Sequence, residues 1–461
     1  MDWNSEVFKK FKCIIEDIPD DFKAIALQMI KLKAEEITES RKRNIVEEVD
    51  MMNALLTVTP NSFRPLMFES VKKVGIILEN YTEIEEVSEA WKEVPNYLHK
   101  DTLHLLWQLT DRCNSRCIHC RVDSKRTKPI DEESTESIFS MIDNIIDSWD
   151  HPTKKIVFNF TGGEPLLRKD IWDILYYAKE RAEPKGHMIA FASNGYLIND
   201  KIAEKLRDHG VGLIFISLDS MNPDINDQIR GRKGSFELQK HAIEACNKAG
   251  ILVIISCTVM KHNFDSFIGI KEYAEKLGVF YYFTGIIRVG RAHENWESIG
   301  LTDKQYEKLY HIKFGDIIQD IRKGEAEKIP LMSCFDMVPF MEIPASIKDR
   351  EFLEWGVGCQ SCRCVMGIGI HGEVYPCEFI TQTVLGNLKK QSFKEIYNSE
   401  MASILREHRD RHGKCGECEH LDLCGGGCIL HTETMTGDIL GSLPYCWHDP
   451  EDHNHFNVKN F

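Results

Sequence analysis

The chain has 461 residues, a formal net charge of −15, 43% hydrophobic residues and 16 cysteines. This length exceeds what one compact core usually serves, so two or three domains are expected. The acidic balance argues against nucleic acid or an anionic membrane as the main partner. No apolar run approaches the length of a membrane span, and the charged N-terminus does not read as a signal peptide, so a cytoplasmic protein is expected.

The cysteines are better explained by metal binding than by disulfides, because a reducing compartment keeps thiols reduced. Twelve of the sixteen fall in two groups, within residues 113–120 and 359–446. The four that stand apart are interpreted as small buried hydrophobic side chains, namely Cys13, Cys246, Cys257 and Cys334.

Residues 1–100 are predicted to form a helical module without strands. Helical periodicity with proline punctuation covers the segments Phe8–Glu16, Phe22–Glu36, Arg43–Leu56, Ser62–Leu78 and Ile84–Val94.

Residues 101–300 alternate between strand and helix patterns, which predicts an α/β fold with a parallel sheet and right-handed crossovers. The expected strands are Leu103–Leu109, Ile156–Phe160, Met188–Ser193, Gly212–Leu218, Leu252–Val259 and Tyr281–Ile287. The expected helices are Glu132–Ser148, Lys169–Arg181, Asp200–Asp208, Ser235–Ala249 and Phe264–Leu277. Barrel-like sheets of this kind place their chemistry at the C-terminal ends of the strands.

Residues 301–354 are predicted to be a helical connector, with the helical pattern over 302–325. Residues 355–461 form a Gly- and Cys-rich extension with little core of its own, so bound metal would supply much of its folding free energy. His448, His453 and His455 lie in an acidic, polar tail and are interpreted as solvated.

Three cysteines follow the first predicted strand in the segment CNSRCIHC, at Cys113, Cys117 and Cys120. Three thiolates from one loop can hold three irons of a cubic [4Fe–4S] cluster and leave the fourth iron open to a ligand. The alternative is a zinc site completed by His119.

The later strands end in small and polar residues. The second strand is followed by Thr161-Gly162-Gly163-Glu164-Pro165, where two glycines allow a ligand to approach the backbone and the carboxylate can accept a hydrogen bond from an ammonium group; a plain turn is the alternative. Ser193-Asn194-Gly195 and Ser217-Leu218-Asp219 end the next two strands and suit a ligand with ribose and amino-acid parts, or simply cap the following helices. Arg230, in the loop 229–232, is a candidate clamp for a carboxylate.

This set of motifs on successive strands resembles the radical S-adenosylmethionine (SAM) enzymes over about residues 101–290. The resemblance implies a partial (β/α)6 barrel in which Cys113, Cys117 and Cys120 hold a cluster whose open iron chelates the amino and carboxylate groups of SAM. One electron then cleaves SAM to a 5′-deoxyadenosyl radical. The resemblance also implies an electron donor such as flavodoxin or ferredoxin, and SAM contacts at Gly162, Gly163, Glu164, Ser193, Asn194, Ser217, Asp219 and Arg230.

The second cysteine group, Cys415-x2-Cys418-x5-Cys424-x3-Cys428-x17-Cys446, resembles the SPASM extension of many radical SAM enzymes. The resemblance implies two auxiliary [4Fe–4S] clusters, which with the barrel cluster makes three. One would use Cys415, Cys418, Cys424 and Cys446. The other would use Cys377, Cys428 and two of Cys359, Cys362 and Cys364, with Cys359 and Cys362 favoured by spacing. Full ligation would suit electron transfer, and a zinc ribbon is the alternative.

Glu378 directly follows Cys377. In the anaerobic sulfatase-maturating enzymes, which this region resembles, an Asp at the matching position acts as a base. A carboxylate near an anionic cluster should have a raised pKa, as a base requires, whereas the alternative is an exposed surface Glu.

The expected function is therefore radical-based oxidative modification of a peptide or protein side chain. One alternative is a small-molecule substrate, such as a tetrapyrrole side chain undergoing oxidative decarboxylation. No winged-helix peptide-recognition pattern is visible in residues 1–100, which keeps that alternative open. A third interpretation is a non-catalytic zinc- or iron-binding interaction protein.

Overall fold

The computed structural model describes residues 2–18, 20–58, 64–76, 102–122, 132–309, 312, 359–418, 421, 425–444 and 446. Within these ranges the buried apolar side chains form three clusters. One belongs to the N-terminal module, one lies between the sheet and its helices, and one fills the inside of the curved sheet. None of the described helices is both long and apolar enough to cross a membrane.

The N-terminal module is helical, with one small sheet. Four of the predicted helices are confirmed as α1 (Ser5–Glu16), α2 (Asp20–Ser40), α3 (Glu48–Val58) and α4 (Arg64–Lys73), while the predicted helix Ile84–Val94 lies outside the described residues. Strands β1 (Asp2–Trp3) and β2 (Ile45–Val46) pair in parallel, so the expectation of a module without strands is wrong. Two-residue strands are too short to show an alternating pattern.

A parallel sheet of six strands forms the body of the molecule, as predicted. In chain order the strands are β3 (Thr102–Gln108), β4 (Lys155–Thr161), β5 (Met188–Ser193), β6 (Val211–Ser217), β7 (Leu252–Val259) and β8 (Phe280–Gly285). Each pairs in parallel with the next, and β8 ends the sheet without pairing to β3, so the barrel is open. The C-terminal ends of all six strands therefore meet at one rim, the barrel mouth.

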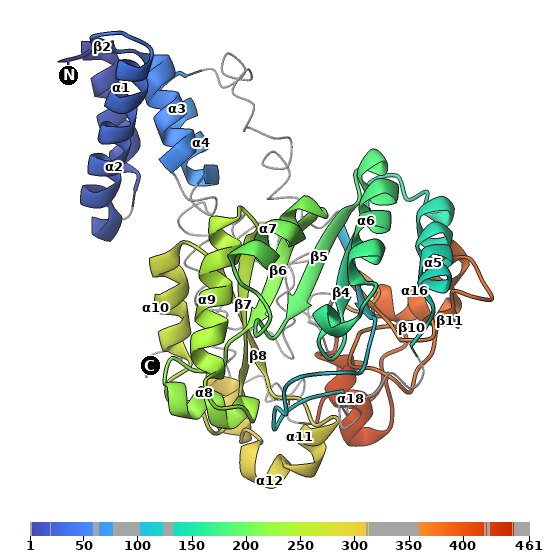
Figure 1. Ribbon diagram of the computed structural model, residues 1–461. Helices are drawn as coiled ribbons and strands as arrows, with labels where there is room; N and C mark the ends of the chain where they lie inside the picture. Colours follow the sequence, from blue (N-terminus) through green and yellow to red (C-terminus); the bar gives the residue numbers. More distant parts are fainter. Residues whose placement is uncertain are drawn as a thin grey trace.

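Helices pack on the outside of these strands, as Figure 1 shows for the green and yellow part of the chain. They are α5 (Thr135–Ser148), α6 (Ile171–Ala182), α7 (Asp200–Asp208), α8 (Pro223–Arg230), α9 (Ser235–Lys248) and α10 (Ile268–Leu277). Helix α8 was not predicted, because residues 229–232 were interpreted as a loop. It begins after the N-cap Asn222, has Pro223 in its first turn and ends at Gly231 in the left-handed conformation.

Shorter elements complete the described barrel. Helix η5 (Pro165–Leu167) follows β4, η6 (Glu183–Lys185) follows α6, and α11 (Arg291–Glu294) and α12 (Trp296–Ile299) follow β8. Residues 303–309 of the predicted connector are helical, and the rest of the connector, residue 312 excepted, lies outside the described residues.

The C-terminal extension is built onto the barrel. Strand β9 (Val365–Ile368) pairs in parallel with β3, and β10 (Glu373–Tyr375) and β11 (Gly386–Asn387) continue the sheet in antiparallel fashion. The other elements of the extension are α15 (Phe393–Tyr397), α16 (Glu400–Arg406), η9 (Gly413–Cys415) and α18 (Ile429–Thr436). The sheet thus has nine strands rather than six.

The extension shares the core of the barrel, which differs from the expectation that it has little core of its own. Asn144 on α5 donates to the carbonyl oxygen of Leu388 at 2.6 Å and accepts from the backbone N–H of Phe393 at 2.9 Å. Buried Ile368, Val374, Phe393 and Ile396 belong to the same apolar cluster as the strands of the barrel. Residues of α16 and α18 belong to this cluster as well, namely Ala402, Leu405, Ile429 and Leu430. Burial against the barrel therefore holds most of the described extension, whereas residues 411–418 contribute nothing to the cluster.

The isolated cysteines follow the prediction in part. Cys246 and Cys257 are fully buried in the barrel core. Cys13 is exposed, so its interpretation as a buried residue is wrong; it lies on the face of α1 opposite the buried residues Phe11 and Ile15. Cys334 lies outside the described residues.

Candidate active site

The loop with the first three cysteines runs across the barrel mouth directly after β3. Its backbone is held by the end of α8, since the N–H groups of Arg116 and Ile118 donate to the carbonyl oxygens of Arg230 and Ile229 at 3.2 and 2.9 Å. On the far side of the mouth, the N–H of Arg291 donates to the carbonyl oxygen of Cys120 at 2.9 Å. The loop is therefore fixed from two sides before any cofactor is considered.

Two glycines make this close approach possible. Gly231 and Gly290 both have positive φ angles, at 62° and 54°. A Cβ atom would lie 2.4 Å from the carbonyl oxygen of Arg116 at Gly231, and 2.5 Å from that of Cys120 at Gly290. Any larger residue at either position would push the cysteine loop away from the mouth.

The three thiols lie in a sheltered environment. Burial raises the pKa of Cys113 to about 12 and raises the pKa of Cys120 as well. Arg230 Nη1 lies 3.8 Å from the Sγ atom of Cys117, and the Ser115 hydroxyl lies 3.1 Å from the same sulfur. Thiols in such a place become thiolates when a metal takes the proton's position.

The double glycine after β4 packs against the cysteine loop. At Gly162, with φ 146°, a Cβ atom would lie 2.3 Å from the carbonyl oxygen of Thr110, and at Gly163 it would lie 2.2 Å from that of Arg112. The N–H of Gly163 donates to Thr110 at 2.8 Å. The two glycines were predicted to let a ligand approach the backbone closely. In the structure, the start of the cysteine loop makes a close contact of this kind.

Glu164 is the centre of a buried hydrogen-bond network. Its side chain is fully buried, and its carboxylate accepts from the Ser193 hydroxyl at 2.9 and 3.0 Å and from the backbone N–H of Asn194 at 2.8 Å. Burial raises the pKa of Glu164 to about 7. In the structure the Glu164 carboxylate, predicted to accept a hydrogen bond from a ligand ammonium, accepts from Ser193 and Asn194.

Asn194 extends this network to the first cysteine. Its side-chain amide donates to the side chain of Asn114 at 2.7 Å and lies 3.6 Å from the Cys113 sulfur. Neither predicted capping role is observed, because Asn199 caps α7 and Asn222 caps α8. Ser193 and Asn194 therefore position the cysteine loop, and Ser217 is half-buried at the end of β6.

Asp219 and Arg230 form a buried ion pair. Arg230 Nη2 lies 2.7 Å from Asp219 Oδ2, and the Asp219 side chain is fully buried. Asp219 Oδ1 also accepts from the N–H of Thr258 on β7 at 2.9 Å. Arg230, the predicted clamp for a ligand carboxylate, therefore pairs with Asp219 in the structure, and it lies at the end of α8 rather than in a loop.

His119 joins the same cluster. Its Nε2 atom lies 3.9 Å from Asp219 Oδ2, and burial lowers the pKa of His119 to about 4, so the ring is neutral. In the described part of the chain, no three Cys, His, Asp or Glu side chains converge on one point.

The second cysteine group lies in the extension. Cys359, Cys362, Cys364 and Cys415 are buried, Cys377, Cys418, Cys428 and Cys446 are partly exposed, and Cys424 lies outside the described residues. Cys362 has a positive φ of 59°, and its N–H donates to the carbonyl oxygen of Val365 at 2.8 Å. Burial raises the pKa of Cys362 to about 12, and the nearby charge of Cys359 acts in the same direction.

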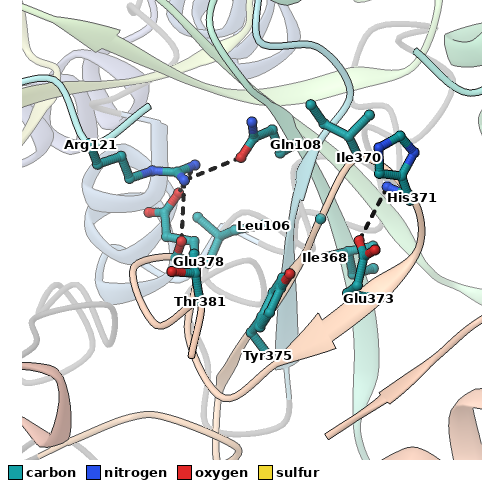
Figure 2. Close-up of a pocket in the computed structure, with 11 residues that line it drawn as sticks. Leu106, Gln108, Arg121, Ile368, Ile370, His371, Glu373, Tyr375, Glu378 and Thr381 are labelled. Atoms are coloured by element: carbon teal, nitrogen blue, oxygen red, sulfur yellow. Dashed lines mark hydrogen bonds and ion pairs between the residues drawn. The ribbon is translucent and has the colours of Figure 1, made fainter. Parts of the chain in front are cut away.

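A cavity of about 250 Å³ opens between β3 and the hairpin of β9 and β10. Figure 2 shows the side chains around it. Seven of its eleven lining residues are polar, namely Gln108, Arg121, His371, Glu373, Tyr375, Glu378 and Thr381. The cavity thus lies where the barrel mouth meets the extension, close to both cysteine groups.

An ion pair across this cavity joins the two cysteine loops. Arg121, next to Cys120, places Nη2 2.9 Å from Glu378 Oε2 and donates through Nη1 to the carbonyl oxygen of Glu378 at 3.2 Å. The side chains are only 16% and 18% exposed, so the interpretation of Glu378 as an exposed surface residue is wrong. Arg121 was missed as a site residue, although its position directly after Cys120 was a usable signal.

The comparisons with known proteins agree with this geometry. The Radical SAM superfamily model matches residues 107–274, and the SPASM iron–sulfur cluster-binding domain model matches residues 359–419. The chain is 30% identical over 355 residues to the AdoMet-dependent heme synthase of Methanosarcina barkeri, which covers 75% of this chain and 96% of that protein.

Two further relatives carry different printed functions. The mycofactocin maturase MftC of Mycobacterium ulcerans is 31% identical over 352 residues, covering 75% of this chain and 86% of that protein. The solved structure of Streptococcus suis SuiB bound to its precursor peptide SuiA has a TM-score of 0.57 at 16% identity, covering 86% of this chain and 90% of that one, which is a likeness of fold.

The chain belongs to the radical SAM superfamily and, within it, to the enzymes that carry a SPASM domain. It is therefore an enzyme of radical SAM chemistry, with domains that bind SAM and iron–sulfur clusters.

Proposed function

We propose that this enzyme cleaves SAM reductively at a [4Fe–4S] cluster held by Cys113, Cys117 and Cys120, and uses the resulting radical to oxidise a peptide or protein side chain. The observation that carries the proposal is the cysteine loop itself, pinned across the barrel mouth by Arg230, Ile229 and Arg291. A loop fixed in this way supplies three thiolates and leaves room for a fourth, exchangeable ligand.

The residues around the loop fit an anionic thiolate cluster. The guanidinium of Arg230 lies 3.8 Å from the Cys117 sulfur and the amide of Asn194 lies 3.6 Å from that of Cys113, so both sulfurs face donors. When bound, the cluster supplies the electron that breaks the sulfonium bond of SAM. The protein orients the sulfurs, and the backbone of Gly162 and the side chain of Ser217 are our candidates for direct contacts with SAM.

Other predicted SAM residues act behind these contacts. Glu164 and Ser193 tie the ends of β4 and β5 together, while Asp219 holds Arg230 in place. Their role is to fix the shape of the barrel mouth, because their polar atoms are already bonded within the protein.

We further propose two auxiliary clusters in the extension. One uses Cys415, Cys418, Cys424 and Cys446, and the other uses Cys377, Cys428 and two of Cys359, Cys362 and Cys364. Complete ligation suits electron transfer away from an oxidised substrate. A low-potential flavodoxin or ferredoxin would supply the first electron, and the many reduced cysteines favour a cytoplasmic location.

The cavity between β3 and β10 is the proposed substrate site. Its volume of about 250 Å³ suits one side chain better than a whole large substrate. Glu378 faces this cavity and is the candidate base that accepts a proton from the oxidised substrate. A peptide presenting one residue would fit this arrangement.

A tetrapyrrole is the second candidate substrate. The similarity to the Methanosarcina barkeri heme synthase, which extends over 96% of that protein, favours it. A tetrapyrrole could insert one propionate side chain into the same cavity while the macrocycle stays outside.

The first test is 5′-deoxyadenosine formation by anaerobically reconstituted protein with SAM and dithionite. Cys113→Ala/Cys117→Ala/Cys120→Ala should abolish it. Cys246→Ala removes a buried barrel thiol from α9 and should leave the product and the iron content unchanged. Formation of 5′-deoxyadenosine by the triple variant would refute the assignment of these cysteines.

The second test separates the substrates. Wild-type enzyme with SAM and reductant is incubated with iron coproporphyrin III in one arm, and in the other with any short peptide encoded beside this protein. Loss of carbon dioxide from the porphyrin would establish the tetrapyrrole reaction and refute the leading proposal. Loss of hydrogen or a crosslink in the peptide would establish the peptide reaction.

A further inference from the structure

Arg411 is a buried cation in the cysteine-rich extension. The residue is only 6% exposed, and its Nε atom is buried without a hydrogen-bond partner. Its Nη1 and Nη2 atoms donate to the backbone carbonyl oxygens of Ile439 and Gly426 at 2.6 and 2.7 Å. Among the described residues, no carboxylate lies within ion-pair distance of this guanidinium, since both of its hydrogen bonds are to neutral carbonyl groups.

The guanidinium lies against the segment that joins two predicted ligands. Gly425, Gly426 and Gly427 stand between Cys424 and Cys428, and all three have positive φ angles, of 66°, 78° and 75°. A Cβ atom at Gly426 would lie 2.4 Å from Arg411 Nε. The three glycines thus bend the backbone around Arg411, which no other residue type could do without strain.

The same carbonyl group also faces a predicted cluster ligand. The Sγ atom of Cys415 lies 3.9 Å from the carbonyl oxygen of Gly426, to which Arg411 donates. Cys415 and Arg411 therefore share one neighbouring atom, which places the cation near the thiol.

An unpaired buried charge costs several kcal/mol, so a buried guanidinium normally has an anionic partner. A cluster with four thiolate ligands carries net negative charge and would supply that partner. The guanidinium would in turn affect the cluster. A nearby cation stabilises the reduced state, which is the more negative one.

We propose that Arg411 is the internal counter-ion of the auxiliary cluster held by Cys415, Cys418, Cys424 and Cys446, and that it raises the reduction potential of that cluster relative to the other auxiliary cluster. This inference rests on the proposed presence of auxiliary clusters and assigns a specific residue to tuning one of them. Arg411 is a positioning residue, since it acts on the cluster and not on substrate.

The test is a redox titration of anaerobically reconstituted holoenzyme, followed by electron paramagnetic resonance. Arg411→Gln should make one auxiliary cluster harder to reduce. We expect the ratio of reduced to oxidised cluster at a fixed potential to fall about tenfold, which is about 59 mV for one electron. The barrel cluster and the other auxiliary cluster should keep their potentials.

A matched control lies two residues away. Arg409 is about half exposed, pairs with Glu407 at 2.6 Å, and carries the same charge. Arg409→Gln should leave all three potentials unchanged. Arg406 is a charge that acts on Cys362. Arg406→Gln should therefore shift the other auxiliary cluster and leave the first where it is.

Arg411→Lys keeps the positive charge but loses the several N–H donors of the guanidinium. It is the second variant, for use if Arg411→Gln does not fold. A wild-type potential with full iron content is expected for it. Two outcomes would overturn the inference. In the first, Arg411→Gln shifts the reduction potential no more than Arg409→Gln does. In the second, Arg411→Lys shifts the potential as much as is predicted for Arg411→Gln. Wild-type protein without auxiliary iron would instead refute the proposed clusters themselves.

Discussion

The barrel mouth and the cysteine-rich extension differ in the partners of their buried arginines. At the mouth, buried or half-buried arginines lie on carboxylates, in the pairs Arg112–Glu132, Arg121–Glu378, Arg168–Asp170 and Arg230–Asp219. In the extension, the hydrogen bonds of Arg411 to the described residues are all to carbonyl groups. The mouth thus pairs each of these arginines with a carboxylate of the protein, whereas the proposed partner of Arg411 is an anionic cluster.

Metal removal should expose this difference most strongly. When iron is stripped by an anaerobic chelator, amide hydrogen exchange should stay slow in β4–β7 and accelerate in residues 411–418, which contribute nothing to the apolar cluster of the barrel. We expect about a hundredfold or greater loss of protection in that segment, because bound metal supplies several kcal/mol of folding free energy in a small metal-held region.

The control for this experiment is another part of the extension. Strand β9 pairs with β3, and Phe393 packs in the barrel core, so 365–368 and 393–397 should keep their protection. Equal loss of protection in β9 and in 411–418 would show that the extension folds as one metal-dependent unit, contrary to the comparison.

The Arg230–Asp219 pair should give the next largest effect. Arg230→Met leaves the fully buried Asp219 carboxylate without its partner and should lower the free energy of unfolding by about 3–5 kcal/mol. Chemical denaturation of the metal-free protein measures this loss. Adding Asp219→Asn should recover much of it, because the uncompensated charge is then gone.

An exposed pair provides the control. Arg207 and Asp208 are 51% and 61% exposed, so Arg207→Met should cost less than about 1 kcal/mol. A similar cost for Arg230→Met would mean that water or another cation serves Asp219, contrary to the pairing described for the mouth.

A smaller effect is expected from pH at the opposite end of the barrel. His187 precedes β5, and burial lowers its pKa to about 4. The unfolded chain binds this proton near pH 6.5, so the folded state loses stability as the pH falls from about 6.5 to 4. The shift corresponds to about 3 kcal/mol at the acid end.

The comparison of wild type with His187→Gln isolates this contribution. The variant should lose less unfolding free energy than the wild type between pH 7 and pH 4.5, as measured by denaturant titration. His209→Gln, at the surface, should follow the wild-type profile. Parallel profiles for the wild type and His187→Gln would show that the ring is not buried in solution.

The sequence was sufficient for elements whose signals are local. Strands Met188–Ser193 and Leu252–Val259 and helix Asp200–Asp208 were predicted with their observed bounds. Buried Ile, Val and Phe runs define the two strands, and Asn199 caps the helix. Helix α8 was missed although its Asn-Pro start and Gly231 end are ordinary helix signals.

Contacts between residues far apart in the chain could not be predicted from the sequence alone. The spacing of Cys113, Cys117 and Cys120 is local and was recognised, but the bond from Asn194 to Asn114 spans 80 positions. Likewise β9 has only four residues, and its pairing with β3 depends on the packing of the whole extension. Polar residues after strands were therefore predicted as ligand contacts, while several of them bond to one another.

The weakest predicted effect concerns an ion pair that joins the two cysteine loops. Arg121 and Glu378 follow Cys120 and Cys377, and they are 257 positions apart. Reversing either charge, as Arg121→Glu or Glu378→Arg, should lower the melting temperature of the holoenzyme. The loss should correspond to about 1 kcal/mol, because the pair is only partly buried. The double charge swap should restore part of it.

Product formation by the same variants shows whether Glu378 acts as a base or only as the ion-pair partner of Arg121. If Glu378 accepts a proton from substrate, the double swap restores the melting temperature while product formation stays low, because an arginine at 378 cannot take that proton. Formation of 5′-deoxyadenosine should remain in all three variants, since the barrel cysteines are untouched. Recovery of product together with stability would instead show that the ion pair only holds the two cysteine loops together, and the base would have to be sought elsewhere in the cavity.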